Sequence, residues 1–467
     1  MKKTKTLFAA LILMLTSYGL YAQDISGKWY GLLKVQGTEL RIDFNLNKEG
    51  EALKATLDSP DQKAFGIPVS KASFEDSQLF LELTALGAQY EGELFSKDSI
   101  SGTFTQRGMS FPLNLSRKEI ARTLVKRPQE PVKPYPYKEE FVSFKGGGDF
   151  ELAGTLTTPF NSTKGAPLVI LITGSGPQNR DEEFMGHKPF FVLADQLTRA
   201  GISVLRYDDR GTGGSGGSFH QSTSLDFAKD AAAAVEFVKS RPDLSHSKIG
   251  LAGHSEGGLI APVTTTYTDE VDFLVLMAGP GVSGKEILLD QTKLIGKTSG
   301  LSQTDLEVET AFAKKIFNVA ETYKDMSQRK EELSRLFKEE LKARPDIKPA
   351  KMSEEEFLNA QLPQFLSPWW SYFIFHEPKE YLKKVAVPVL AINGSLDVQV
   401  PAERNLKAIE HALQDGGNKQ VTIKEFKGLN HLFQECETGA MSEYEKIDQT
   451  MSPEVMKYMT EWMLNLK

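Results

Sequence analysis

The stretch KIGLAGHSEGG at positions 248–258 decides the fold of this 467-residue chain. Its first part, Lys248–Ala252, has the apolar character of a short buried strand, and Gly258–Val263 can begin a helix. Between them Gly253–His254–Ser255–Glu256–Gly257 matches G-x-S-x-G, a motif whose serine lies on a sharp strand-to-helix turn with its hydroxyl exposed. The flanking glycines permit such a strained turn. The stretch therefore predicts that Ser255 is a catalytic nucleophile.

A second match to the same motif lies in Gly213–Gly214–Ser215–Gly216–Gly217. Here Asp208–Asp209–Arg210 separates the serine from the preceding apolar run, and no helix pattern follows at once. The overlapping residues 211–216 also spell G-x-G-x-x-G, but a dinucleotide-binding fingerprint passes directly from a strand into a helix. We therefore assign Ser215 to a glycine-rich loop and not to catalysis.

Apolar runs like the one before Ser255 recur from Phe141 onward and alternate with helix patterns. Near-continuous apolar strands are typical of a parallel sheet covered on both faces. The runs are Leu168–Ile172, Ile202–Tyr207, Ile249–Ala252, Phe273–Met277, Val387–Ile392 and Val421–Phe426, and the amphipathic patterns are Phe190–Arg199, Phe227–Lys239, Asn405–Leu413 and Pro453–Leu466. Residues 141–467 therefore predict a doubly wound α/β domain.

A long interval, residues 283–382, separates two consecutive strands and reads as charged helices. A connection of this length inside a compact domain is usually functional, and we expect a helical lid. Aromatic side chains gather near its end, at Trp369, Trp370, Tyr372, Phe373 and Phe375. They can form the core of the lid or a wall that faces substrate, and the lid core is the favoured interpretation.

A serine nucleophile needs a base, usually a histidine oriented by a carboxylate. In hydrolases with this serine motif the order along the chain is Ser, acid, His, which leaves His376, His411 and His431. His431 follows the last strand, at the sheet edge where ligands bind in open α/β folds. Asp397 follows the strand before it, in the turn after Val387–Ile392. We therefore predict a triad of Ser255, Asp397 and His431.

The negative charge that forms on a substrate carbonyl should be bound by two backbone amides. One is supplied by the residue after the nucleophile, Glu256, and the other by the loop after an early strand. That loop is Thr173–Gly174–Ser175–Gly176–Pro177. Ser175 is the favoured second donor and Gly176 the alternative, whereas Pro177 has no N–H.

The N-terminal part of the chain has a different organisation. Residues 1–22 combine a lysine-containing start, an apolar run and a final alanine, which predicts a signal peptide and export to the periplasm or medium. Residues 24–117 show short alternating strands with frequent turns, and they predict a small antiparallel β domain of accessory role. Residues 118–140 are rich in proline and predict a stiff linker.

Composition is that of an ordinary globular protein, with a formal net charge of −7. An acidic chain without a basic stripe is a poor candidate for nucleic-acid binding. No segment after the signal peptide is long and apolar enough to predict a membrane span. Cys436 is the only cysteine, so no intramolecular disulfide can form, and we expect a spectator thiol.

In these motifs the chain resembles bacterial α/β-hydrolase esterases related to serine aminopeptidases and dienelactone hydrolases. The strings that carry the resemblance are Gly174–Pro177 with Arg180–Glu182, Arg206–Gly211, Gly253–Gly258, Gly394–Asp397 and Leu429–His431. They cover the chain from about Phe141 to its end. The resemblance implies an α/β-hydrolase fold, carboxylesterase activity on small or medium acyl esters, and no cofactor. Thr173 departs from the histidine that many relatives carry at that point, and the β domain lies outside the resemblance.

The sequence thus predicts a serine carboxylesterase that forms an acyl-enzyme on Ser255 and takes small-molecule esters. Two other functions remain open. A serine peptidase or amidase uses the same triad, and a non-catalytic binding protein can keep the same fold. The sequence names no partner for the β domain.

Overall fold

The computed structural model describes residues 24–466, apart from 36–37, 51, 63, 107–108, 121–126, 162–164, 245–247 and 349–351. The predicted signal peptide, residues 1–22, lies outside the described residues. The chain forms two compact units, residues 1–122 and 123–467. Within the described ranges no helix has the length and apolar character needed to cross a bilayer.

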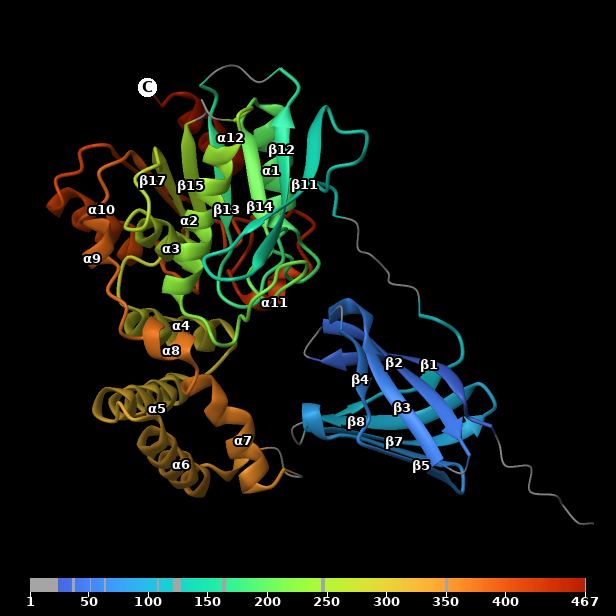
Figure 1. Ribbon diagram of the computed structural model, residues 1–467. Helices are drawn as coiled ribbons and strands as arrows, with labels where there is room; N and C mark the ends of the chain where they lie inside the picture. Colours follow the sequence, from blue (N-terminus) through green and yellow to red (C-terminus); the bar gives the residue numbers. More distant parts are fainter. Residues whose placement is uncertain are drawn as a thin grey trace, which may run out of the picture. The chain divides into compact units, whose positions relative to one another are not determined.

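The first unit is an antiparallel sheet that curls on itself (Figure 1). Its strand order is β4-β3-β2-β1-β10-β8-β7-β6-β5, with β9 paired to β8. The strands are β1 (Gly27–Val35), β2 (Thr38–Glu49), β3 (Ala52–Ser59), β4 (Ala64–Pro68), β5 (Lys71–Glu75), β6 (Gln78–Leu83), β7 (Ala88–Ser96), β8 (Ser99–Gln106), β9 (Met109–Pro112) and β10 (Leu115–Ser116). Short 3₁₀ turns cover Pro60–Gln62 and Thr84–Leu86.

Alternation of buried and exposed side chains creates the core of this unit. Strand β6, for example, buries Leu79, Leu81 and Leu83 and turns the residues between them outward. Trp29 and Tyr90 are fully buried inside the curl. The unit therefore has an apolar core of its own.

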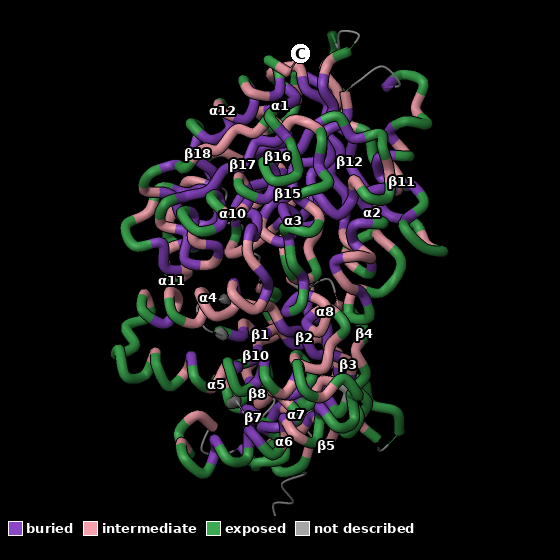
Figure 2. The backbone as a smooth tube through the Cα atoms, turned by 90° about the vertical axis from the view of Figure 1, so that its left-hand side faces the viewer, coloured by how far each residue is buried: buried purple, intermediate pink, exposed green. Residues whose placement is uncertain are grey.

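The second unit is built on an eight-stranded sheet with the order β11-β12-β14-β13-β15-β16-β17-β18. Strands β11 and β12 pair antiparallel, β12 pairs antiparallel with β14, and the other neighbours are parallel. The strands are β11 (Tyr137–Lys145), β12 (Glu151–Pro159), β13 (Leu168–Ile172), β14 (Ser203–Tyr207), β15 (Ile249–His254), β16 (Phe273–Met277), β17 (Val389–Gly394) and β18 (Val421–Phe426). The central strands are buried throughout, as apolar runs in a parallel sheet require (Figure 2).

Helices cover both faces of this sheet and form two separate cores. Helices α1 (Pro189–Arg199) and α12 (Pro453–Leu464) pack on one face. Helices α2 (Ser224–Ser240), α3 (Glu256–Thr264) and α10 (Ala402–Asp415) pack on the other. The short α11 (Met441–Tyr444) follows β18. This is the three-layer α/β arrangement that the sequence predicts.

The chain between β16 and β17 is helical and carries its own apolar cluster. Its helices are α4 (Gly284–Thr298), α5 (Gln303–Thr322), α6 (Met326–Ala343), α7 (Glu354–Phe365), α8 (Pro368–Phe373) and α9 (Lys379–Leu382), with a 3₁₀ turn at Pro345–Ile347. Reciprocal capping boxes begin α4 at Ser283 and Glu286, and α5 at Ser302 and Asp305. We refer to α4–α9 as the lid helices.

The segment predicted as a linker, residues 118–140, overlaps the sheet at its C-terminal end. Strand β11 begins at Tyr137 because the Tyr137 ring is buried and its hydroxyl donates a hydrogen bond to Asp195 of α1 at 2.8 Å. The start of this strand was not predicted, because the prolines before Tyr137 are typical of a linker. Proline prevents regular pairing only where its own N–H is needed, and Pro136 lies just outside β11.

Candidate active site

Ser255 lies between β15 and α3 with backbone angles φ 54° and ψ −119°. Few non-glycine residues adopt a positive φ, so the surrounding structure has to impose it. The Ser255 N–H donates to Met277 O at 2.8 Å. A Cβ added to Gly257 would lie 2.2 Å from Ile172 O, so helix α3 approaches the sheet at a distance that only glycine allows. The strand–turn–helix setting predicted for Ser255 is present.

Asp397 and His431 follow the neighbouring strands β17 and β18. His431 Nδ1 lies 2.7 Å from Asp397 Oδ2, and each residue is 4% exposed. The other carboxylate oxygen, Asp397 Oδ1, accepts hydrogen bonds from Gln399 N at 2.8 Å and Val400 N at 2.9 Å. The structure therefore brings the predicted acid and base together and fixes the acid in its turn.

Ser255 and His431 come from different loops at the same sheet edge. Among the described residues no hydrogen bond joins the Ser255 hydroxyl to His431. Catalytic hydrogen bonds are often long or poorly aligned in free enzymes and tighten when substrate binds. The two loops are linked through His254, whose Nε2 lies 2.9 Å from His431 O.

The oxyanion loop, residues 173–176, runs beside the nucleophile. A Cβ added to Gly174 would lie 3.2 Å from Ser255 Cβ. Glu256 is the first residue of α3, so its N–H has no partner within the helix. Gly176 has φ 94°, and Ser175 is exposed. All three predicted oxyanion residues therefore lie in the two segments that border Ser255.

Two carboxylates anchor this loop. Gly174 N–H donates to Glu182 Oε1 at 2.8 Å, and the Thr173 hydroxyl donates to Asp209 Oδ1 at 2.6 Å. Asp209 Oδ2 also accepts from Gln178 N at 2.9 Å. The Thr173 hydroxyl thus ties the loop to the end of β14.

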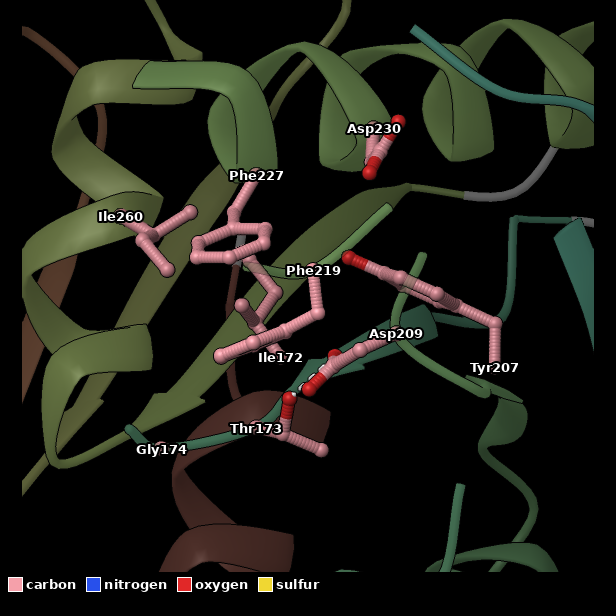
Figure 3. Close-up of a pocket in the computed structure, with 9 residues that line it drawn as sticks. All are labelled: Ile172, Thr173, Gly174, Tyr207, Asp209, Phe219, Phe227, Asp230 and Ile260. Carbon is pink, nitrogen blue, oxygen red and sulfur yellow. Dashed lines mark hydrogen bonds between the residues drawn. The ribbon is translucent and has the colours of Figure 1, made fainter. Parts of the chain in front are cut away.

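A small cavity of about 10 Å³ lies behind the oxyanion loop (Figure 3). The residues that line it are Ile172, Thr173, Gly174, Tyr207, Asp209, Phe219, Phe227, Asp230 and Ile260. Its size suits about one water molecule. Because none of Ser255, Asp397 and His431 lines it, we assign it to the support of the loop and not to substrate.

The side chain of Glu256 points away from solvent and is 2% exposed. Its Oε1 accepts hydrogen bonds from Ser224 Oγ at 2.6 Å and from Trp369 Nε1 of α8 at 2.8 Å. Burial raises the pKa of Glu256, and hydrogen bonds from Ser224, Trp369 and Ser175 oppose that rise. The residue that follows Ser255 therefore binds α8, one of the lid helices.

The aromatic residues at the end of the lid do not all belong to the lid core. Trp370 is 5% exposed and belongs to the lid core, and Phe373 packs against the sheet domain. Trp369 stacks on Phe373 at 5.0 Å and reaches Glu256 beside the nucleophile. Phe375 is exposed.

Ser215, the serine of the second motif match, has a structural role. Its hydroxyl donates to Asp208 O at 2.7 Å and accepts from Ala153 N at 2.9 Å. Asp208 in turn pairs with Arg180 at 2.7 Å. Ser215 therefore holds a loop against β12.

Two residues near the site, His254 and Glu182, have no role in the sequence-based prediction of the triad and oxyanion donors. His254 Nδ1 lies 2.9 Å from Glu182 Oε1, and both side chains are buried. The only signal in the sequence was their position in the strings Arg180–Glu182 and Gly253–Gly258. The separation of 72 positions hid their contact.

The sheet order, the strained serine turn and the loops at the carboxyl edge define an α/β hydrolase. The family described as "Serine aminopeptidase, S33" matches residues 188–349. Esterase EstD of Thermotoga maritima is 27% identical over 369 residues, which are 78% of this chain and 77% of EstD. These matches confirm the predicted fold class and the resemblance to esterases related to serine aminopeptidases, and the chain is a hydrolase enzyme.

Solved structures of similar proteins include further esterases. The Pyrococcus furiosus esterase Pf2001 is 17% identical, with 70% of this chain and 92% of that chain covered and a TM-score of 0.41. Est1E of Butyrivibrio proteoclasticus with bound ferulic acid is 17% identical, with coverage of 69% and 98% and a TM-score of 0.40. A dienelactone hydrolase of Anabaena variabilis is 16% identical, with coverage of 70% and 97% and a TM-score of 0.37.

Proposed function

We propose that the chain is a serine carboxylesterase that hydrolyses small or medium acyl esters through an acyl-enzyme on Ser255. The observation that carries the proposal is the buried pair of His431 and Asp397, 2.7 Å apart, at the sheet edge that also presents the strained Ser255. A carboxylate at Nδ1 leaves Nε2 of the imidazole to act as base.

In the proposed reaction Ser255 Oγ attacks the ester carbonyl while His431 Nε2 takes the hydroxyl proton. The negative oxygen of the tetrahedral intermediate is bound by the N–H groups of Glu256 and of Ser175 or Gly176. Collapse of the intermediate breaks the bond to the alcohol, which leaves with the proton from His431. Water then attacks the acyl-enzyme by the same route and regenerates Ser255.

A preference for esters over peptides with a free amine is supported by the state of the nearby carboxylates. A substrate ammonium group needs a carboxylate that it can reach. Glu182 and Glu256 are 3% and 2% exposed, and both already accept hydrogen bonds from protein donors. The matching serine aminopeptidase family keeps a peptidase as the second candidate.

The test uses purified protein with a fluorophosphonate probe, followed by nitrophenyl esters of increasing chain length and aminoacyl anilides. We expect labelling at Ser255 and ester turnover well above anilide turnover. Ser255→Ala should lose both, whereas Ser215→Ala, which changes the other motif serine, should keep both. Retained labelling in Ser255→Ala would refute the nucleophile, and faster anilide cleavage would establish a peptidase.

We also propose that the protein is exported, with cleavage near Ala22, because residues 1–22 have the three parts of a signal peptide. N-terminal sequencing of the protein from fractionated cells tests this. An N-terminus at Met1 in the cytoplasmic fraction would contradict it.

A further inference from the structure

A buried carboxylate–imidazole pair, Glu182 and His254, lies directly behind the predicted triad. The two side chains are 3% and 5% exposed. His254 Nδ1 is 2.9 Å from Glu182 Oε1, and the ring centroids of His254 and His431 are 4.8 Å apart. Glu182 itself adopts φ 52°, a conformation that costs free energy in a non-glycine residue and persists only where the structure imposes it.

Both ring nitrogens of His254 face atoms that can only accept a hydrogen bond. Nδ1 faces the carboxylate of Glu182, and Nε2 faces the carbonyl oxygen of His431 at 2.9 Å. A neutral imidazole has one N–H, so it can satisfy only one of these acceptors, whereas the imidazolium satisfies both. The geometry therefore favours a positively charged His254.

His187, another buried histidine, provides the contrast. Its Nε2 lies 2.8 Å from Tyr444 O and 3.1 Å from Gln434 Nε2, which donates, and its Nδ1 lies 3.1 Å from the Thr450 hydroxyl, which can also donate. Because donors face both ring nitrogens, a neutral ring fits this environment. Burial lowers the pKa of His187. Burial also acts to lower the pKa of His254, but Glu182, the His431 carbonyl and Asp397 together outweigh it, and the pKa of His254 is raised. Among the described residues, His431 and Asp397 are further titratable groups that lie near His254 or act on its pKa.

The pair also connects two loops of the site. Glu182 Oε1 accepts the N–H of Gly174 at 2.8 Å, and Gly174 touches Ser255 closely enough that an added Cβ would lie 3.2 Å from Ser255 Cβ. Through His254 the same carboxylate reaches the backbone of His431. One buried charge thus binds the oxyanion loop, the nucleophile turn and the loop of the base.

We propose that Glu182 and His254 are positioning residues. Their ion pair holds the oxyanion loop and the loop that carries His431 in position relative to Ser255. The inference rests on the proposed function, because it concerns the turnover that those loops support. Neither residue exchanges a proton with substrate.

The test replaces the carboxylate by its neutral isostere, Glu182→Gln. An amide cannot hold the charge on His254. If its oxygen accepts from Nδ1–H and Gly174 N–H, Nε2 has no proton for the His431 carbonyl, and if its NH₂ faces Nδ1 instead, the Gly174 N–H loses its acceptor. We expect kcat for a nitrophenyl ester to fall roughly 10- to 100-fold, the scale for loss of a hydrogen bond to a charged group, with little change in KM.

The pH profile separates positioning from general destabilisation. A raised pKa means that the contribution of His254 is complete at low pH and is lost as pH rises through that pKa. In the natural enzyme kcat should therefore fall on the alkaline side when His254 loses its proton. In Glu182→Gln this alkaline limb should move to lower pH.

Asp195→Asn is the matched control. Asp195 lies on α1 and, like Glu182, binds one cationic side chain and one further donor, Arg199 Nε at 2.7 Å and the Tyr137 hydroxyl at 2.8 Å. Asp195→Asn should lower Tm but leave the alkaline limb of kcat in place. Equal kcat losses and identical pH profiles in the two variants would overturn the proposal.

The charge on His254 can also be measured directly, without any dependence on activity. Selective ¹⁵N-histidine labelling of the natural protein should show two protonated ring nitrogens for His254 at pH 7 and a neutral ring for His187. A neutral His254 would refute the ion pair even if Glu182→Gln fails to fold. Failure of fluorophosphonate labelling would instead refute the proposed function and leave this charge state as measured.

Discussion

The hydrogen bond from Trp369 to Glu256 joins the lid to the nucleophile turn, and Trp369→Phe removes it with little else. Phenylalanine keeps an aromatic ring to stack on Phe373, but it has no N–H for Glu256 Oε1, which accepts that N–H at 2.8 Å. Because the carboxylate is 2% exposed, water cannot readily replace the lost donor.

The magnitude follows from the charge of the acceptor. A hydrogen bond to a charged group contributes about 1.5–3 kcal/mol to stability. We therefore expect Trp369→Phe to lower the free energy of unfolding by about 2 kcal/mol at neutral pH. For a unit of this size the unfolding entropy converts that loss into a fall in Tm of about 3 °C.

How the stability loss of Trp369→Phe changes with pH depends on whether the Glu256 carboxylate is ionised. The Trp369 N–H stabilises ionised Glu256, so its contribution is present above the pKa of Glu256 and declines as pH falls through it. Burial raises that pKa, which places the decline above the usual range of a glutamate. At low pH, where Glu256 is a neutral acceptor, the stability loss of Trp369→Phe should shrink to about 1 kcal/mol or less.

Thermal melts followed by circular dichroism over a pH series measure this dependence. Trp370→Phe is the control, because Trp370 lies in the lid core and, among the described residues, has no carboxylate partner. It should lower Tm by the same amount at every pH. A Trp369→Phe loss that is independent of pH, or the same pH dependence in Trp370→Phe, would refute the reasoning.

Three further outcomes are expected. Asp397→Asn should lower kcat by about 10⁴-fold with an unchanged circular dichroism spectrum, because the amide no longer holds the imidazole in its productive tautomer; a loss below tenfold would point to another acid. Burial raises the pKa of Cys436 to about 11, so iodoacetamide at pH 8 should label native protein slowly and leave esterase activity intact, as mass spectrometry and assay can check. Gly257→Ala should abolish the soluble fold because its Cβ would lie 2.2 Å from Ile172 O. The control Gly165→Ala has open space around its Cβ but φ 84°, so it should lower the free energy of unfolding by only about 1 kcal/mol. A stable Gly257→Ala protein would contradict the close packing of α3.

The fold could be predicted because its signals are local. The apolar strand Ile249–His254 and the helix Glu256–Thr264 adjoin each other in the sequence, so the serine turn needed no knowledge of distant residues. The pairing of Asp397 with His431 followed from a topological rule, since loops after neighbouring parallel strands meet at one edge.

Contacts between loops and lid could not be predicted in the same way. Trp369 and Glu256 are 113 positions apart, and neither helix pattern nor strand period indicates which lid residue reaches the nucleophile turn. The start of β11 at Tyr137 was missed because proline content was read as linker through residue 140. No role was predicted for His254, because the charge of a buried histidine depends on partners that are distant in the sequence.

The predicted oxyanion loop is anchored by two carboxylates. The predicted oxyanion donor on this loop is the N–H of Ser175, with Gly176 as the alternative, so the anchors have to use other atoms. The Thr173 hydroxyl and the Gly174 N–H supply them, each bound by a different carboxylate, Asp209 and Glu182. Burial raises the pKa of Asp209 well above its usual value, and the donors Thr173 and Gln178 oppose that rise. Since Thr173 and Gln178 are donors, they favour the ionised carboxylate of Asp209, and the Thr173 hydroxyl holds the loop as long as that charge is kept.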